Sequence, residues 1–152
     1  MTSSSNKVGE IMDNMSIERI WEDAGFFEIE VFAESNLASG RIKTYIPDGG
    51  LDELAMVLAS FPKNFSSRYF WEAGGKKEDP GPYVSFEFWC EDKLGHIIAE
   101  IYMDINDGAV SKHNCCFYIK TEVGLLNSFG KSLAVLSERG IGKKITLHQF
   151  DD

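Results

Sequence analysis

Apolar and polar residues alternate with a period of two along much of the chain, and this alternation is typical of β-strands with one buried face. It is clearest over residues 26–33, where the apolar Phe27 and Ile29 flank the charged Glu28. We expect about six to seven strands, drawn from residues 16–22, 26–33, 40–46, 65–72, 83–91, 97–105, 115–120 and 144–150.

Two other segments repeat apolar residues every three or four positions, which is the spacing of an amphipathic helix. They span residues 51–61, with Asp48 as a candidate N-terminal cap, and residues 121–139, with Thr121 as the cap. Along the chain the order is strands, helix, strands, helix. This order predicts an α+β fold in which two helices pack on one face of a mostly antiparallel sheet, while the other face meets solvent.

The chain of 152 residues has the length of one domain. Residues 1–15 are polar and rich in serine, so we expect a flexible N-terminal arm followed by a single α+β domain over residues 16–152. The Asn-Asp-Gly sequence at residues 106–108 predicts a hairpin turn. The glycines and prolines of residues 73–82 predict a surface loop.

The sequence predicts a protein of the cytoplasm. The first residues lack the apolar core of a signal peptide, and no apolar run approaches the length that crosses a bilayer. Cys90, Cys115 and Cys116 are an odd number and two of them are adjacent, which makes a poor disulfide framework and suits free thiols in a reducing compartment.

Negative charge is concentrated in two parts of the chain. The formal net charge is −9, and the acids exceed the bases by six in residues 1–34 and by five in residues 86–107. Such a surface repels phosphate groups, so we expect no nucleic-acid partner and no membrane partner, whereas a basic protein would be attracted. The alternative is that the charge only keeps the protein soluble.

No catalytic or metal-binding motif accounts for the polar residues. His113 and the three cysteines are the best zinc ligands available, but no pair has the Cys-x-x-Cys spacing, and adjacent cysteines on a strand point to opposite faces. Three scattered histidines form no catalytic constellation. We therefore expect no cofactor, no metal and no enzymatic activity.

The polar side of the expected sheet is the candidate site, because acids combined with aromatic residues suit the recognition of a basic protein surface. An alternative is open: Arg41 and Lys43 could pair with Glu28 and Glu30 across strands, and Trp89 could form an ordinary cross-strand contact with Tyr102. The residues expected to share this partner-binding face are Glu28, Glu30, Glu87, Trp89, Glu100, Tyr102 and Asp104, together with Tyr118.

Residues 27–31 (FEIEV), 51–58 (LDELAMVL), 95–101 (GHIIAEI) and 117–122 (FYIKTE) occur in an order that resembles the small WapI-like immunity proteins of bacterial polymorphic-toxin systems and their relatives. The resemblance implies a cytoplasmic bacterial protein that binds and blocks one cognate toxin, often a nuclease or another basic effector. The resemblance does not assign a function to any particular residue of this chain. The alternative function is a small-molecule or peptide-binding module with a groove between sheet and helix. The oligomeric state has no signature in the sequence.

Overall fold

The computed structural model describes residues 10–75, 81–106 and 112–151, and its strands form two four-stranded antiparallel sheets. The first sheet has the strand order β3-β2-β1-β8, and the second has the order β4-β5-β6-β7. The first sheet consists of β1 (Asn14–Asp23), β2 (Phe26–Glu34), β3 (Ser39–Pro47) and β8 (Lys144–His148). The second sheet consists of β4 (Arg68–Gly74), β5 (Tyr83–Cys90), β6 (His96–Asn106) and β7 (Lys112–Glu122).

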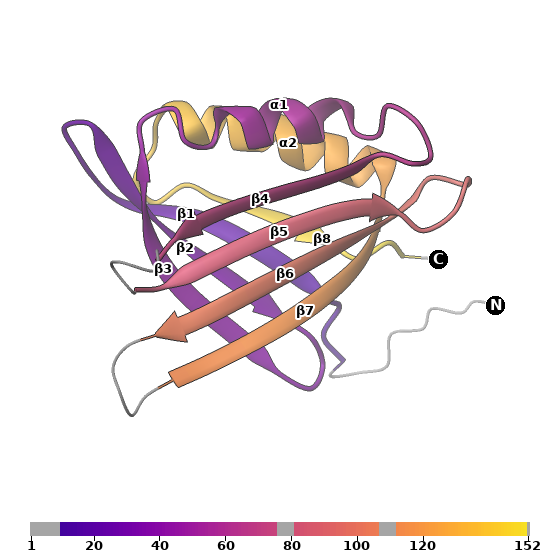
Figure 1. Cartoon of the computed structure of the whole chain (residues 1–152), viewed down its shortest axis with the longest axis horizontal. Helices are drawn as coiled ribbons and strands as arrows, with labels where there is room; N and C mark the ends of the chain where they lie inside the picture. Colours follow the sequence, from indigo (N-terminus) through magenta and orange to yellow (C-terminus); the bar gives the residue numbers. More distant parts are fainter. Residues whose placement is uncertain (1–9, 76–80, 107–111, 152) are drawn as a thin grey trace.

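The two sheets pack face to face around one apolar core. Figure 1 shows the second sheet in front and the strands of the first sheet crossing behind it. The alternate residues of both sheets that point inward, among them Ile29, Val31, Phe86 and Ile101, are fully buried in a single cluster. The two sheets approach each other closely at Gly40, since a Cβ added there would lie 2.7 Å from the Sγ atom of Cys115.

Helices α1 (Asp52–Ser60) and α2 (Val123–Glu138) pack against each other along one side of the two sheets (Figure 1). Gly130 of α2 permits this contact, because a Cβ there would overlap the backbone of Ala59 in α1. The side-chain amide of Asn127 donates to the carbonyl oxygens of Leu58 at 2.8 Å and Phe61 at 3.0 Å. These bonds satisfy carbonyl groups at the end of α1 that have no partner within the helix.

The predicted helix caps are wrong. Leu51 and Glu122 occupy the N-cap positions of the two helices, and neither forms a side-chain capping bond. Thr121 instead lies within β7, one residue before its end, and is fully buried, so its side chain points into the core.

A buried arginine ties the first sheet to the end of α2. Arg19 is 6% exposed, and its guanidinium donates to the carbonyl oxygens of Leu136 at 2.9 Å and Ser137 at 3.0 Å. The same group lies 3.9 Å from the centre of the Phe27 ring and forms a 2.8 Å ion pair with Glu22. A cation in this position stabilises the negative end of the helix dipole.

The α+β class and the antiparallel pairing are confirmed, and the described residues contain eight strands where about six to seven were expected. The strand predicted at 65–72 begins only at Arg68, because the Ser67 hydroxyl accepts bonds from the backbone of Lys63 and Asn64 and holds a turn there. Neither helix in the described chain combines the length and the apolar character needed to cross a bilayer.

Three other predictions fall partly outside the described residues. The expected turn at 106–108 and the expected loop at 73–82 include positions 107–108 and 76–80, which are not described. The expected arm at 1–15 includes the undescribed residues 1–9, whereas β1 already begins at Asn14 and Met15 is buried.

Candidate partner-binding face

The outer face of the second sheet is formed by the alternate residues of β4–β7 that point away from the core. It faces the viewer in Figure 1, and no other described element lies in front of it. Because neighbouring strands are in antiparallel register, the side chains form rows that run across all four strands. An uncovered sheet face that carries large aromatic residues is a candidate for partner binding.

The structure brings five of the seven predicted site residues together. Glu87 and Trp89 on β5 and Glu100, Tyr102 and Asp104 on β6 all lie on the outer face of the second sheet. Tyr118 on β7 joins them, since it is paired with Glu100.

The prediction of one common face is wrong for the remaining two residues. Glu28 and Glu30 lie on β2, on the outer face of the first sheet. The two sheets cover each other's apolar faces, so their polar faces point in opposite directions. A single partner surface cannot contact the centres of both.

A row near the middle of the second sheet contains, in order across the strands, Phe70, Glu87, Glu100 and Tyr118. We call these four residues the central row. Glu87 and Glu100 are directly opposite each other, and like charges in that position repel. The two outer members are aromatic and exposed, at 49% for Phe70 and 55% for Tyr118.

Arg68 lies beside the central row and bonds one of its carboxylates. The Nε atom of Arg68 is 2.5 Å from Oε2 of Glu87, and its guanidinium lies 4.4 Å from the centre of the Trp89 ring. The arginine is therefore held both by a carboxylate and by an aromatic face. Glu100 is instead hydrogen-bonded to the neutral phenol of Tyr118.

Tyrosine hydroxyls bond other carboxylates on this face. Hydrogen bonding to Glu100 and to Cys116 raises the pKa of Tyr118 above its usual range. Tyr83 donates to Glu72 at 2.6 Å, and partial burial followed by this bond raises the pKa of Tyr83 to about 12. Both phenols therefore stay neutral at physiological pH and leave the negative charge of the carboxylates in place.

The alternative explanation by cross-strand pairing holds for Glu30 on the first sheet but not for Glu28, which lies opposite Trp21 and Tyr45. Arg41 forms a 2.7 Å ion pair with Glu30, and Lys43 is directly opposite Glu30. It does not describe the second sheet, where Trp89 is opposite Ile98 and Tyr102 is opposite Ser85.

Sequence analysis missed several exposed aromatic residues. Phe70 was not assigned to a face because the pattern of residues 65–72 is irregular, yet it occupies the outward register of β4. Trp21, Phe26 and Tyr45 form a second cluster at one end of the first sheet, with ring centres 5.5–6.1 Å apart. The signal for Tyr45 was present, since it alternates with buried residues in the same register as Arg41 and Lys43.

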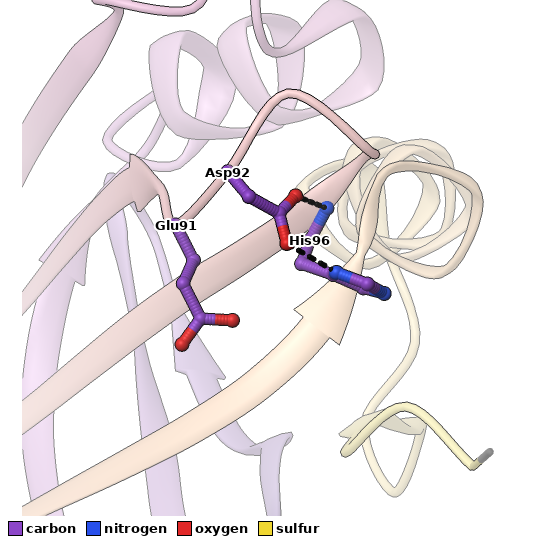
Figure 2. Close-up of side chains that lie close together, drawn as sticks. All are labelled: Glu91, Asp92 and His96. Atoms are coloured by element: carbon purple, nitrogen blue, oxygen red, sulfur yellow. Dashed lines mark hydrogen bonds and ion pairs between the residues drawn. The ribbon is translucent and has the colours of Figure 1, made fainter.

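Glu91, Asp92 and His96 gather at the turn between β5 and β6 (Figure 2). Asp92 accepts hydrogen bonds from His96 Nδ1 at 2.6 Å and from the backbone of Leu94 at 2.8 Å. The bond from His96, with those from the turn amides, holds the pKa of Asp92 below its usual range. Glu91 forms a 2.9 Å ion pair with Lys120.

In the described residues this is the one group of three whose potential metal-ligand atoms all lie within 4.8 Å of one another. A metal ion would have to displace the bond between Asp92 and His96, which already holds the turn. Cys115 and Cys116 point to opposite faces as expected: Cys115 is half-buried near Gly40, whereas Cys116 is exposed. All three cysteines are free thiols.

Three depressions lined by described residues exceed 400 Å³. One of about 460 Å³ lies between α1 and β4 and has apolar walls that include Met56, Phe61 and Tyr69. A second of the same volume lies between α1 and α2 beside Gly130. The third, of about 580 Å³, lies at the end of α2 and is lined by charged residues that include Arg19 and Glu138.

Comparisons with protein-family models, with curated protein sequences and with solved structures found no match to this chain. The class of protein is defined by the fold and the candidate face: an α+β protein with two antiparallel sheets, in which no described element covers the acidic and aromatic outer face of the second sheet.

Proposed function

We propose that this chain is a non-catalytic binding protein of the bacterial cytoplasm, and specifically an immunity protein that binds and neutralises a cognate basic toxin. The observation that carries the proposal is the outer face of the second sheet, where exposed aromatic rings stand among carboxylates with no described element covering them.

The composition of this face supports a basic protein as the partner. Tyrosine and tryptophan supply much of the binding energy at protein interfaces, because they bury a large rigid surface. Carboxylates around them favour a partner of opposite charge and speed its association. The formal net charge of −9 extends this attraction over the whole molecule.

The resemblance to WapI-like immunity proteins supports the choice of a toxin as that partner. A toxin that acts on nucleic acids needs a positively charged substrate surface. An acidic face with aromatic anchors could cover such a surface and exclude the substrate. Inhibition of this kind requires no chemistry from the immunity protein.

The proposal is tested by mixing the purified protein with the toxin encoded beside it, at increasing salt concentrations. We expect a complex at low ionic strength, a weaker complex at high ionic strength, and rescue of cells that express the toxin. Glu100→Lys on the second sheet should weaken the complex by at least tenfold. Glu18→Lys on the first sheet is the matched control, because Glu18 also lies opposite a glutamate but has Lys144 beside it, and it should leave the complex unchanged. Failure to form a complex even at low salt would remove the proposal.

The groove between α1 and β4 favours a second candidate, a module that binds a small molecule or peptide. Its walls are mainly apolar, and Met56 at its edge is 68% exposed. A metabolite at a hundred times its Kd would raise the free energy of unfolding by about 2.7 kcal/mol, which a thermal-shift screen would detect. Met56→Glu should abolish that shift. A screen without any stabilising ligand would count against this candidate.

A further inference from the structure

We infer that the central row of the second sheet, Phe70, Glu87, Glu100 and Tyr118, is a docking site for an arginine side chain of the partner. The inference rests on the proposed function and names the chemistry of the group that is recognised. It follows from how this protein holds its own arginines, and from the central row, in which Glu100 is bonded to the neutral phenol of Tyr118 and, among the described residues, forms no ion pair with an arginine.

Three arginines of the chain share one mode of binding. Each forms an ion pair with a glutamate and also lies over an aromatic ring, so both the charge and the flat face of the guanidinium are engaged. The distances to carboxylate and ring centre are 2.8 and 3.9 Å for Arg19 with Glu22 and Phe27, 2.7 and 4.7 Å for Arg41 with Glu30 and Phe32, and 2.5 and 4.4 Å for Arg68 with Glu87 and Trp89.

Glu100 and Tyr118 present the same combination of groups. They are opposite each other on β6 and β7, so the carboxylate and the ring are neighbours. Within the described part of the chain, no arginine ion pair involves Glu100. A guanidinium supplied by a partner would therefore complete a fourth arrangement of the kind that Arg19, Arg41 and Arg68 form internally.

The opposed carboxylates add a reason for a cation to bind. Glu87 and Glu100 are directly opposite, which places their Cβ atoms about 4.5–5.5 Å apart. Arg68 neutralises one carboxylate of this pair, so negative charge remains on the other. A cation bound over Glu100 would compensate the negative charge that Arg68 leaves on this pair.

The shape of the row favours arginine over lysine. Phe70 and Tyr118 stand at its two ends, and with strands about 4.8 Å apart the row is about 14 Å long. A planar guanidinium can stack on a ring while it donates two parallel hydrogen bonds to a carboxylate, whereas an ammonium group cannot.

The first sheet provides a natural control. Its corresponding row contains Lys144, Glu18, Glu30 and Lys43, so an opposed glutamate pair is present there as well. Each of those glutamates has a lysine directly opposite on the edge strand. A guanidinium from outside would meet repulsion there and no aromatic surface within the row.

The inference is tested by titrating the isotope-labelled protein with ethylguanidinium and following its NMR spectrum. We expect saturable shifts at the central row, with millimolar affinity, and at least a threefold weaker effect of ethylammonium. Glu87→Gln/Glu100→Gln should weaken binding of the probe at least tenfold. The matched variant Glu18→Gln/Glu30→Gln should retain it. Spectra of both variants show whether the fold is intact.

The inference is overturned if the shifts are spread equally over both sheets, if the double variant of the second sheet binds as well as the wild type, or if ethylammonium binds equally. These outcomes differ from failure of the proposed function. If the probe binds but no toxin does, the arginine site stands without its proposed partner. If a toxin binds but the probe does not, the docking site lies elsewhere.

Discussion

The outer faces of the two sheets carry the same central feature in different surroundings. On each face the two middle strands place a glutamate opposite a glutamate, Glu18 with Glu30 on the first sheet and Glu87 with Glu100 on the second. The edge strands add lysines to the first pair and aromatic rings to the second. The first row is therefore neutralised within the chain, whereas the second retains charge beside exposed apolar surface.

This difference shows that the residues on the edge strands determine whether an acidic sheet face keeps its negative charge and offers apolar surface to a partner. Glu18 and Glu30 of the first sheet each lie opposite a lysine, so their row has balanced charge and contains no aromatic ring. Flanked by Phe70 and Tyr118, the glutamates of the second sheet offer both charge and apolar area to a partner. The count of carboxylates alone does not distinguish the two faces.

The largest expected effect is a loss of stability when the packing between the two sheets is disturbed, because this packing keeps the two outer faces on opposite sides of the molecule. Gly40→Leu places a large side chain where even a Cβ would lie 2.7 Å from Cys115 Sγ. The sheets must move apart, so we expect a loss of about 2–3 kcal/mol in the free energy of unfolding, measured by urea denaturation.

The matched control for this substitution is Ser39→Leu, on the exposed side of the same strand. It should change the free energy of unfolding by no more than about 0.5 kcal/mol. Equal stability of the two variants would show that the sheets are not packed closely at Gly40.

The next effect comes from converting the central row into a copy of the row on the first sheet. Phe70→Lys/Tyr118→Lys removes both rings and supplies cations for Glu87 and Glu100. We expect affinity for ethylguanidinium and for the basic partner to fall by about tenfold to a hundredfold, which corresponds to about 1.4–2.8 kcal/mol. Calorimetric titration measures this change.

The reverse conversion, Lys43→Tyr/Lys144→Phe, should create weak ethylguanidinium binding at Glu18 and Glu30. The comparison between the faces breaks down if neither exchange changes the binding of the probe.

We expect a smaller effect on the free energy of unfolding when one glutamate of each pair is neutralised, and the two pairs should respond differently. Glu100→Gln relieves repulsion from Glu87 and should raise the free energy of unfolding by about 0.5 kcal/mol. Glu18→Gln removes an acid that lies opposite Lys144, so it should leave stability unchanged or lower it by a similar amount. Denaturation at low and high salt measures both values, and high salt should shrink the difference. Changes of the same sign would contradict the proposed contrast.

The smallest effect is seen in alkaline solution. The pKa of Tyr83 is raised from 10.0 to about 12, so the folded protein holds this proton to a higher pH than the unfolded chain does. The resulting stabilisation is complete below pH 10.0 and is lost as the pH rises toward about 12. Absorbance at the phenolate band should show several late-titrating tyrosines, and Tyr83→Phe should remove one of them. If the variant keeps every late-titrating component, the assignment to Tyr83 is contradicted.

Much of the local structure could be predicted from the sequence. The alternation around Phe27 and around Phe86 predicted which side of each strand is buried, because a strand turns successive side chains to opposite faces. The same rule predicted that Glu87 and Glu100 point outward. It failed for residues 65–72, where a turn held by the Ser67 hydroxyl delays the start of the strand and so concealed Phe70.

The candidate site was predicted only in part, for a different reason. Alternation shows which residues share one side of a strand, but it does not show which strands are neighbours. Placing Glu28 with Glu87 required the assumption of a single sheet. Arg68 was missed as well, since its bond to Glu87 depends on a register between β4 and β5 that no local pattern encodes.

Local patterns in the sequence were sufficient to place the strand and helix segments, the inward and outward residues of most strands, and a surplus of negative charge. The division of the eight described strands into two sheets, and the position of the two glutamate pairs on opposite surfaces with different flanking residues, became known from the folded structure. The physical reason is that strand identity follows from side chains close in sequence. Sheet membership and register depend instead on packing between distant segments, such as the close approach of Gly40 to Cys115.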